Sequence, residues 1–392
     1  MYTFKIKGVE NINQYEELIK VFLPANMYVL SEEEAVGDEN AAVFTFEGDK
    51  DALKRNIYRY LSEATGKSPK WGILTGIRPV KLAGELSDRL GCEEAAKKLM
   101  EDYLIHPQKV SLVMDILDYQ RRLLGRPHKD SISIYMGIPF CPTRCLYCSF
   151  TSNQVKKPEI DRYLQALYKE IDYCAERIRC GSYNAESLYI GGGTPTSLDE
   201  YQLEQLLDRI CSSFDVRAMR EFTVEAGRPD TITPEKLRLM KKYGVGRISI
   251  NPQSMKQETL DIIGRAHTVR ETEAAFEMAR DAGFHCINAD LIAGLPQEET
   301  DDFSRSLNRM IAMGAENITV HTLAVKKASR LMELDSDFNY KREDVCGSMV
   351  EYAHEALKKS GYEPYYLYRQ KHTSGNTENV GFCRKDLISP YN

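Results

Sequence analysis

Three cysteines, Cys141, Cys145 and Cys148, lie close together in the segment GIPFCPTRCLYCSF. Their spacing lets a single loop bring three thiolates to one metal centre. A structural zinc site needs four ligands, and no second Cys or His pair with zinc-finger spacing occurs in the chain. A four-iron cluster held by three cysteines leaves one iron open for another ligand. The spacing therefore favours a reactive [4Fe-4S] cluster, with zinc or a chance group of thiols as the alternatives.

A glycine triplet, Gly191–Gly192–Gly193, is followed by Thr194 and Pro195. Glycines let the backbone approach a ligand closely and leave its N–H and C=O groups available. The triplet is not a phosphate-binding loop, because no Gly-Lys-Ser/Thr follows it. We expect a ligand-facing loop here, and a simple tight turn is the alternative.

Polar residues follow several of the expected strands. Glu225 ends one strand, Gln253 follows another after Asn251-Pro252, Asp290 ends a third, and Arg265 and His267 lie in the turn IGRAH. A single polar residue at such a position is usually a cap. Because the carboxyl ends of parallel strands share one edge of a sheet, we expect these side chains to converge there. Such a rim would suit a polar ligand with an amine, a carboxylate and ribose hydroxyls.

The elements that would position these residues begin near residue 132. Short β-branched or aromatic runs predict strands at 132–138, 187–191, 221–226, 246–251, 286–292 and 317–322. Helical patterns lie between and after them, at 159–178, 199–213, 234–243, 270–282, 300–313 and 343–360. Six β-α repeats predict a parallel sheet with right-handed crossovers. Six units are too few for a closed eight-stranded barrel, so we expect an α/β fold with a partial (β/α)6 barrel.

Residues 1–130 have a different pattern. Strands are expected at 2–8, 27–31 and 42–47, with helices at 12–23 and 49–64, which predicts a small α+β domain over 1–66. Trp71 to Leu82 then leads into two helices at 83–101 and 107–124, and Pro127 marks a linker at 126–130. We therefore divide the chain into four parts: the α+β domain at 1–66, a helical connector at 67–130, the barrel at 131–370, and the start of a C-terminal region at 371–392.

The composition is that of an ordinary globular protein. The 392 residues include 52 Lys+Arg and 58 Asp+Glu, for a formal net charge of -6 and a mean hydropathy of -0.44. No uncharged apolar run approaches the roughly 20 residues of a membrane helix, and the first residues lack a signal peptide's apolar core. The other seven of the ten cysteines show no motif spacing. We expect a soluble cytoplasmic monomer that binds neither membranes nor nucleic acid.

The motifs taken together resemble a known family. CxxxCxxC and GGGTP resemble the radical S-adenosylmethionine (SAM) superfamily. The fuller set IPFCPTRCLYCSF, YIGGGTPTSL, FTVEAGRPDTIT, RISINPQSM, IGRAHT and INADLIAGLP is similar to its oxygen-independent coproporphyrinogen III oxidase branch. The stretches TGIRPVKL and YYLYRQKHTSGNTENVG resemble the HemZ type within that branch.

The resemblance implies a set of site residues. Cys141, Cys145 and Cys148 would bind the [4Fe-4S] cluster. The other positions that match SAM contacts of the family are Tyr135, Tyr147, Gly192, Gly193, Thr194, Glu225, Gln253, Arg265, Asp290 and Ala324. Among these, Gly192, Gly193 and Thr194 would meet the methionine end of SAM.

The resemblance also implies a reaction. With one electron from a donor such as flavodoxin or ferredoxin, the cluster cleaves SAM and yields a 5′-deoxyadenosyl radical. The radical takes a hydrogen from a propionate of coproporphyrinogen III, and loss of carbon dioxide and an electron leaves a vinyl group. This step of haem biosynthesis occurs twice. Arg369 and Lys371, just past the last expected helix, are candidates for pairing with the carboxylates of the porphyrinogen substrate, and a solvated helix end is the favoured alternative.

Two departures from the family pattern keep other functions open. Coproporphyrinogen enzymes carry a further Cys two residues after the triad, where this chain has Phe150, as the related haem-chaperone branch does. After Gly381 the sequence FCRKDLISPYN differs from that of relatives, and we expect a truncated product. A haem-binding chaperone of the same fold and a non-catalytic protein that binds SAM and the cluster are therefore the alternatives.

Overall fold

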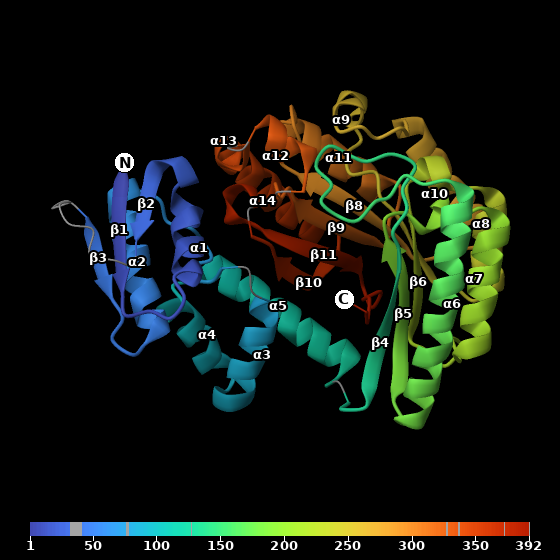
Figure 1. Cartoon of the computed structure of the whole chain (residues 1–392), viewed down its shortest axis with the longest axis horizontal. Coiled ribbons are helices and arrows are strands. Elements are labelled where there is room, and N and C mark those ends of the chain that lie inside the picture. Colours follow the sequence, from blue (N-terminus) through green and yellow to red (C-terminus); the bar gives the residue numbers. More distant parts are fainter. Residues whose placement is uncertain are drawn as a thin grey trace.

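The computed structural model describes residues 1–31, 41–75, 78–126, 128–326, 328–335, 338–371 and 373–391. Pro127, expected to mark a linker, lies outside these residues. Figure 1 shows the N-terminal unit on one side of the molecule, the connector helices beside it, and a curled sheet with helices on its outer face. The expected α/β fold class, with a partial barrel, is confirmed.

The N-terminal unit has the expected β-α-β-β-α order, formed by β1 (Tyr2–Lys7), α1 (Asn13–Phe22), β2 (Tyr28–Ser31), β3 (Ala42–Thr45) and α2 (Lys50–Thr65). The central strand β1 pairs in parallel with both β2 and β3. Phe4 and Ile6 alternate with polar residues along β1 and are buried in one cluster with Leu18 and Ile57 of the two helices. This unit therefore has a hydrophobic core of its own.

The connector contains α3 (Pro79–Leu90), α4 (Cys92–Glu101) and α5 (Pro107–Leu124). The single helix expected over 83–101 is wrong, because the chain breaks at Gly91. Gly91 has φ 87° and ψ 161°, a conformation that favours glycine and ends a helix. Helical periodicity on both sides hid this break.

The barrel sheet contains the six expected strands as β4 (Ser131–Ile138), β5 (Asn184–Gly192), β6 (Glu221–Gly227), β7 (Arg247–Ile250), β8 (Ile287–Ala293) and β9 (Asn317–Thr322). Each pairs in parallel with the next along the chain. The helices that follow them are α6 (Lys157–Cys180), α7 (Glu200–Ser213), α8 (Pro234–Lys242), α9 (Gln257–Ile262), α10 (Val269–Asp281), α11 (Thr300–Ala312), α12 (Arg330–Leu334), α13 (Phe338–Lys341) and α14 (Glu343–Lys359). None of the described helices combines the length and apolar composition needed to cross a bilayer.

Two strands that the sequence analysis did not predict extend this sheet. β10 (Tyr362–Arg369) and β11 (Glu378–Arg384) form an antiparallel hairpin, and β11 pairs antiparallel with β9. Among the described residues the sheet order is β10-β11-β9-β8-β7-β6-β5-β4. The expected boundary at residue 370 thus falls between two strands of one sheet. The hairpin matters for function because it forms a wall of the site described below.

Candidate functional site

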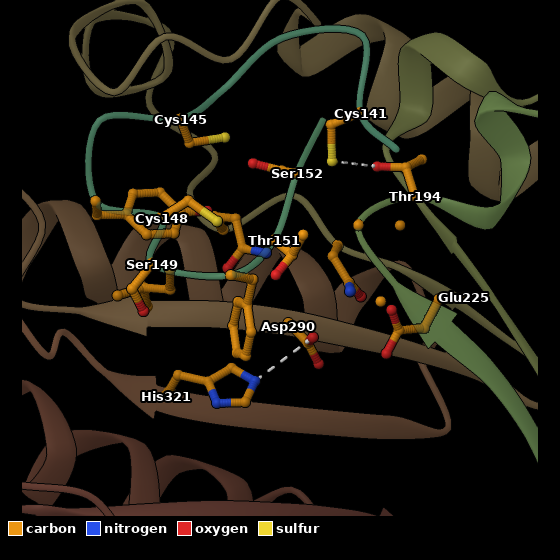
Figure 2. A pocket seen from close by; sticks show the side chains of 18 of the residues that line it. Cys141, Cys145, Cys148, Ser149, Thr151, Ser152, Thr194, Glu225, Asp290 and His321 are labelled. Carbon is orange, nitrogen blue, oxygen red and sulfur yellow. Dashed lines mark hydrogen bonds and ion pairs between the residues drawn. The ribbon is translucent and has the colours of Figure 1, made fainter. Parts of the chain in front are cut away.

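A cavity of about 620 Å³ lies at the carboxyl ends of the barrel strands. Its lining includes all thirteen residues expected at the site, namely Tyr135, Cys141, Cys145, Tyr147, Cys148, Gly192, Gly193, Thr194, Glu225, Gln253, Arg265, Asp290 and Ala324. Figure 2 shows the cysteines on one side of this space and Glu225, Asp290 and His321 on the other. As expected for side chains at the carboxyl ends of parallel strands, these residues lie together in one cavity.

The cysteine loop after β4 is fastened at several points. The Cys141 amide donates to Asn153 O (3.2 Å) and the Asn153 amide to Pro139 O (2.8 Å), which closes the loop at its base. The Leu146 amide donates to Ile263 O (2.9 Å), next to the end of α9. The loop is therefore held to a neighbouring element without any ligand.

Arg228, from the end of β6, also holds this loop. Its guanidinium is bidentate to Asp230 (3.1 and 3.0 Å) and donates to Thr143 Oγ1 (2.7 Å). The Arg228 residue is only 3% exposed, so its guanidinium depends on these partners for its hydrogen bonds. Arg228 thus joins the loop between the first two cysteines to β6.

The three sulfur atoms point toward a common space (Figure 2). Cys141 Sγ lies 3.3 Å from Thr194 Oγ1. Burial raises the pKa of both Cys141 and Cys148. No three His, Cys, Asp or Glu side chains of the described residues lie close enough to surround a single metal ion.

The glycine triplet packs directly against the cysteine loop. A Cβ on Gly193 would lie 2.6 Å from Phe140 O and 2.9 Å from Cys141 Sγ, and one on Gly192 would lie 2.8 Å from Ile138 N. Gly192 also has φ 114°, which side chains rarely adopt. Larger residues would therefore displace the cysteine loop, so the triplet is required for close packing here.

Glu225 lies at the end of β6, beside the glycine triplet. Tyr189 donates its hydroxyl to Glu225 Oε1 (2.7 Å). Removal from water raises the pKa of Glu225 to about 7, and the nearby charge of Asp290 acts in the same direction. Glu225 therefore changes its charge near neutral pH.

Asp290, at the middle of β8, behaves in the opposite way. Burial alone would raise its pKa, but His321, Asn288 and Thr319 together lower it below the usual value. The Asn288 amide donates to Asp290 Oδ1 (2.7 Å). Asp290 therefore stays ionised to a lower pH than an ordinary Asp, which makes the two carboxylates chemically distinct.

Several buried polar atoms beside the cavity have no hydrogen-bond partner among the residues that the structure describes. They are Asn251 Oδ1, Gln253 Oε1, and Nε and one terminal nitrogen of Arg265. The other terminal nitrogen of Arg265 lies 3.5 Å from the Tyr147 hydroxyl. Such atoms are costly to bury unless a ligand completes their hydrogen bonds. Their presence fits a ligand that offers both donors and acceptors.

Local backbone geometry explains how Gln253 and Arg265 reach the cavity. Gln253 has φ 67°, and its backbone exchanges hydrogen bonds with Asp290 O (2.9 Å) and the Ile292 amide (3.0 Å). Gly264, with φ 72°, ends α9, and the Arg265 amide then turns back to Leu260 O (2.9 Å). The side chains of Gln253 and Arg265 therefore both extend from backbone that is held by hydrogen bonds.

Some expected residues lie elsewhere. His267 is fully buried beside Asp230 and is absent from the cavity lining. The hypothesis that Arg369 pairs with substrate carboxylates is wrong, because Arg369 is buried against the Trp71 ring and donates to Leu74 O (2.6 Å). Lys371 lies outside the cavity and pairs with Glu17 (3.3 Å).

Other residues of the cavity were missed. Arg228, His321, Tyr368, Gln370 and Asn379 all line it. His321 lies near the end of β9 as Glu225 lies near the end of β6, so the sequence carried a signal for it, whereas Asp290, expected to end its strand, lies at the middle of β8. The last three come from or follow the unpredicted hairpin, so no local signal pointed to them. Phe150, noted as a departure from the coproporphyrinogen enzymes, is 65% exposed and also lines the cavity.

Comparison with known proteins agrees with this geometry. The family model of the radical SAM superfamily matches residues 135–310. The oxygen-independent coproporphyrinogen-III oxidase-like protein HemZ of Bacillus subtilis (strain 168) is 43% identical over 345 residues, which are 86% of this chain and 68% of that protein. Heme chaperone HemW of the same bacterium is 37% identical over 195 residues, which are 50% of this chain and 51% of that protein. The chain thus spans about two thirds of one relative's length and half of the other's.

A solved structure supports the fold. The radical SAM enzyme coproporphyrinogen III oxidase (HemN) from Escherichia coli superposes with a TM-score of 0.56 at 24% identity. The match covers 68% of this chain and 58% of that one. At this identity the likeness concerns the arrangement of the strands and helices, and it agrees with the partial barrel seen here.

Proposed function

This chain belongs to the radical SAM superfamily, in the family of oxygen-independent coproporphyrinogen III oxidase-like proteins, and from that premise we propose that it performs SAM-dependent radical chemistry on a porphyrinogen. The family implies a [4Fe-4S] cluster and SAM as cofactors. The single observation that carries the proposal is the convergence of three thiols, two unlike carboxylates and several unpartnered polar atoms in one cavity.

In this proposal Cys141, Cys145 and Cys148 hold the cluster. Three arguments support them as ligands: they lie on one fastened loop, their sulfurs face a common space, and Gly193 leaves that loop room to pack. When bound, a reduced cluster together with SAM supplies methionine and a 5′-deoxyadenosyl radical that takes a hydrogen atom from the substrate.

The remaining residues would bind SAM. Glu225 and the backbone of Gly192 and Gly193 are suited to the ammonium and carboxylate of its methionine part. Asp290, ionised and hydrogen-bonded by its neighbours, is suited to accept from ribose hydroxyls. Gln253 and Arg265 offer the unpartnered polar atoms described above.

We propose a propionate side chain as the reacting group. Removal of one hydrogen atom from its β-carbon, followed by loss of carbon dioxide and transfer of one electron to an acceptor, gives a vinyl group. The walls of the cavity would limit the access of water to the reacting carbon. This assignment follows the name of the HemZ relative, and the whole protein's activity is part of the proposal.

Haem binding is a second candidate. The HemW relatives are named heme chaperones, and Phe150 stands exposed in the cavity beside the cysteine loop. In that case the cavity would bind a tetrapyrrole without altering its propionates. The two candidates differ in their products, so they can be separated by one experiment.

That experiment uses protein reconstituted with iron and sulfide without oxygen. We expect about four irons per chain, loss of the cluster in Cys145→Ala, and retention in Cys174→Ala, whose thiol is exposed elsewhere. With dithionite and SAM, 5′-deoxyadenosine should form, and coproporphyrinogen III should yield vinyl products. Tight haem binding without vinyl products would favour the chaperone. Stoichiometric zinc without iron in protein purified anaerobically would refute both.

A second test separates SAM binding from cluster binding. Asp290→Ala removes a carboxylate that is no cluster ligand, so SAM should bind about 10-fold or more weakly while iron content stays unchanged. The measurement is calorimetric titration of the reconstituted protein with SAM. Loss of iron together with SAM affinity would show that Asp290 instead holds β8 to its neighbours.

A further inference from the structure

The cationic side chains of the cavity differ in their partners. The guanidinium of Arg228 already donates hydrogen bonds to Asp230 and Thr143. Arg265 is 9% exposed, and its guanidinium lies beside the Tyr147 hydroxyl. Lys326 also lines the cavity and is half-buried. Within the described part of the chain, its ammonium has neither an ion pair nor a hydrogen bond. Arg265 also has unpartnered N–H groups, but the proposed function assigns them to SAM, so among the described lining residues Lys326 is the cation left for a substrate anion.

The backbone at Lys326 is fixed. Its carbonyl accepts from both the amide and the hydroxyl of Ser329 (2.8 Å each), just before α12. Two residues earlier, Ala324 forms an antiparallel bridge with Thr373, and Leu323 O accepts from the Ser374 amide (3.1 Å). The segment that carries Lys326 is thus attached to the segment that follows β10, and its flexible side chain begins from a rigid position.

An ammonium beside a cavity gives up part of its hydration when a ligand fills the adjoining space. A carboxylate placed opposite it would offset this cost through a charge-assisted hydrogen bond. The cavity wall near the hairpin also offers Gln370 and Tyr368, which are hydrogen-bonded to each other (3.4 Å). Arg369 and Lys371, which follow Tyr368 closely in sequence, face other parts of the protein.

We propose that Lys326 is a substrate-recognition residue, whose ammonium binds a carboxylate of the tetrapyrrole that enters this cavity. The inference rests on the proposed function, because it takes the ligand to be a tetrapyrrole with carboxylate side chains. Beyond the proposed function, the inference names Lys326 as the residue that recognises those carboxylates.

The test measures binding of coproporphyrin III, a stable oxidised form with four carboxylates, through its fluorescence. Lys326→Met should weaken binding about 10-fold and reduce its dependence on salt, because one charge-assisted contact is lost. Lys326→Glu should weaken it further, and Lys326→Arg should restore it to within about threefold. Lys371→Met is the matched control and should bind like the wild type. Iron content and thermal unfolding of each variant check the fold.

Equal affinity of the wild type and Lys326→Met would overturn the inference, as would an equal loss in Lys371→Met or no binding by the wild type. Formation of 5′-deoxyadenosine by the wild type without porphyrin tests the radical chemistry separately. If that product forms but Lys326→Met binds normally, recognition fails and the radical function stands. If it does not form but binding depends on Lys326, the radical function fails and recognition stands.

Discussion

His321 Nε2 lies 3.5 Å from Asp290 Oδ2, across the boundary between β9 and β8 (Figure 2). The other ring nitrogen, Nδ1, lies 2.9 Å from the Tyr368 hydroxyl on β10. One imidazole therefore connects the last parallel strands to the antiparallel hairpin. Because His321 is among the groups that lower the pKa of Asp290, this contact keeps a carboxylate ionised at the floor of the cavity.

We predict that His321→Phe changes the pH dependence of SAM binding. Burial raises the pKa of Asp290, and His321 is one of the groups that lower it. Without His321 the pKa of Asp290 should rise, so its carboxylate should become protonated at a higher pH than in the wild type. SAM affinity should be within about threefold of the wild type at pH 8 but about 3–10-fold weaker at pH 5.5. Calorimetric titration at both values checks this. His285→Phe, at an exposed position, is the control, and an affinity ratio independent of pH would contradict the prediction.

Glu225→Gln should remove a second pH effect. In the wild type the carboxyl is protonated below about pH 7, so affinity for cationic SAM should rise as the pH increases through 7. The amide of the variant still accepts from Tyr189 but does not titrate, so this rise should disappear. The raised pKa of Glu225 also affects folding. In the unfolded chain a Glu ionises at about pH 4.3, whereas in the folded protein Glu225 stays protonated until about pH 7. Above about pH 4.3 this difference lowers the free energy of unfolding of the wild type.

We therefore expect Glu225→Gln, without ligands, to be about 1–3 kcal/mol more stable than the wild type at pH 8 and nearly equal at pH 4. Denaturant unfolding at the two pH values measures this difference. Glu235→Gln, on the exposed face of α8, supplies the comparison and should show little change at either pH. A stability difference for Glu225→Gln that is the same at both pH values would show that the carboxyl is not the titrating group.

Much of the site was predictable because its signals are local. The spacing of Cys141, Cys145 and Cys148 lies within one loop, and Glu225 and Asp290 each follow a recognisable β pattern. A parallel sheet then brings strand ends together regardless of the details of side-chain packing. Side chains near the strand ends consequently share one cavity with the residues that only the family resemblance implied, and family membership is confirmed by the HemZ relative.

What the sequence did not reveal depends on distant contacts. Strand β10 pairs with β11 through a bulge near Pro364, and this register has no local signature. From the sequence YYLYRQK, Arg369 is a candidate for binding an anionic ligand. In the structure its partners are Trp71 and Leu74, which are nearly 300 residues away in the chain. The direction of a long side chain depends on such partners, so Arg369 could not be excluded as a substrate-binding cation without the structure.

Arg228 should be required for a stable cluster loop. Arg228→Ala would leave Asp230 without its bidentate partner and Thr143 without its donor, so we expect a loss of about 1–3 kcal/mol in unfolding free energy. Iron should also be removed faster by a chelator. Arg228→Lys should restore little, because an ammonium cannot make the bidentate contact. Arg238→Ala, an exposed residue paired with Glu235, should behave like the wild type, and iron loss at the wild-type rate in Arg228→Ala would refute this role.

Gly193→Ala tests the packing between the triplet and the cysteine loop. The new Cβ would lie 2.6 Å from Phe140 O and 2.9 Å from Cys141 Sγ, so the loop must move away. Because the φ of Gly193 is not in the left-handed region, the effect is steric and not conformational. We expect about 1–3 kcal/mol of destabilisation and a large loss of reconstituted iron.

Gly246→Ala is the matched control for this substitution, since a Cβ there meets nothing within 4 Å and its φ is also outside the left-handed region. It should reconstitute fully, so any general sensitivity of the fold to added methyl groups would be detected. Iron content measured after anaerobic reconstitution of both variants decides the matter. A Gly193→Ala protein with four irons per chain would mean that the loop tolerates displacement at Cys141, and close packing by the triplet would then have no role in holding the cluster.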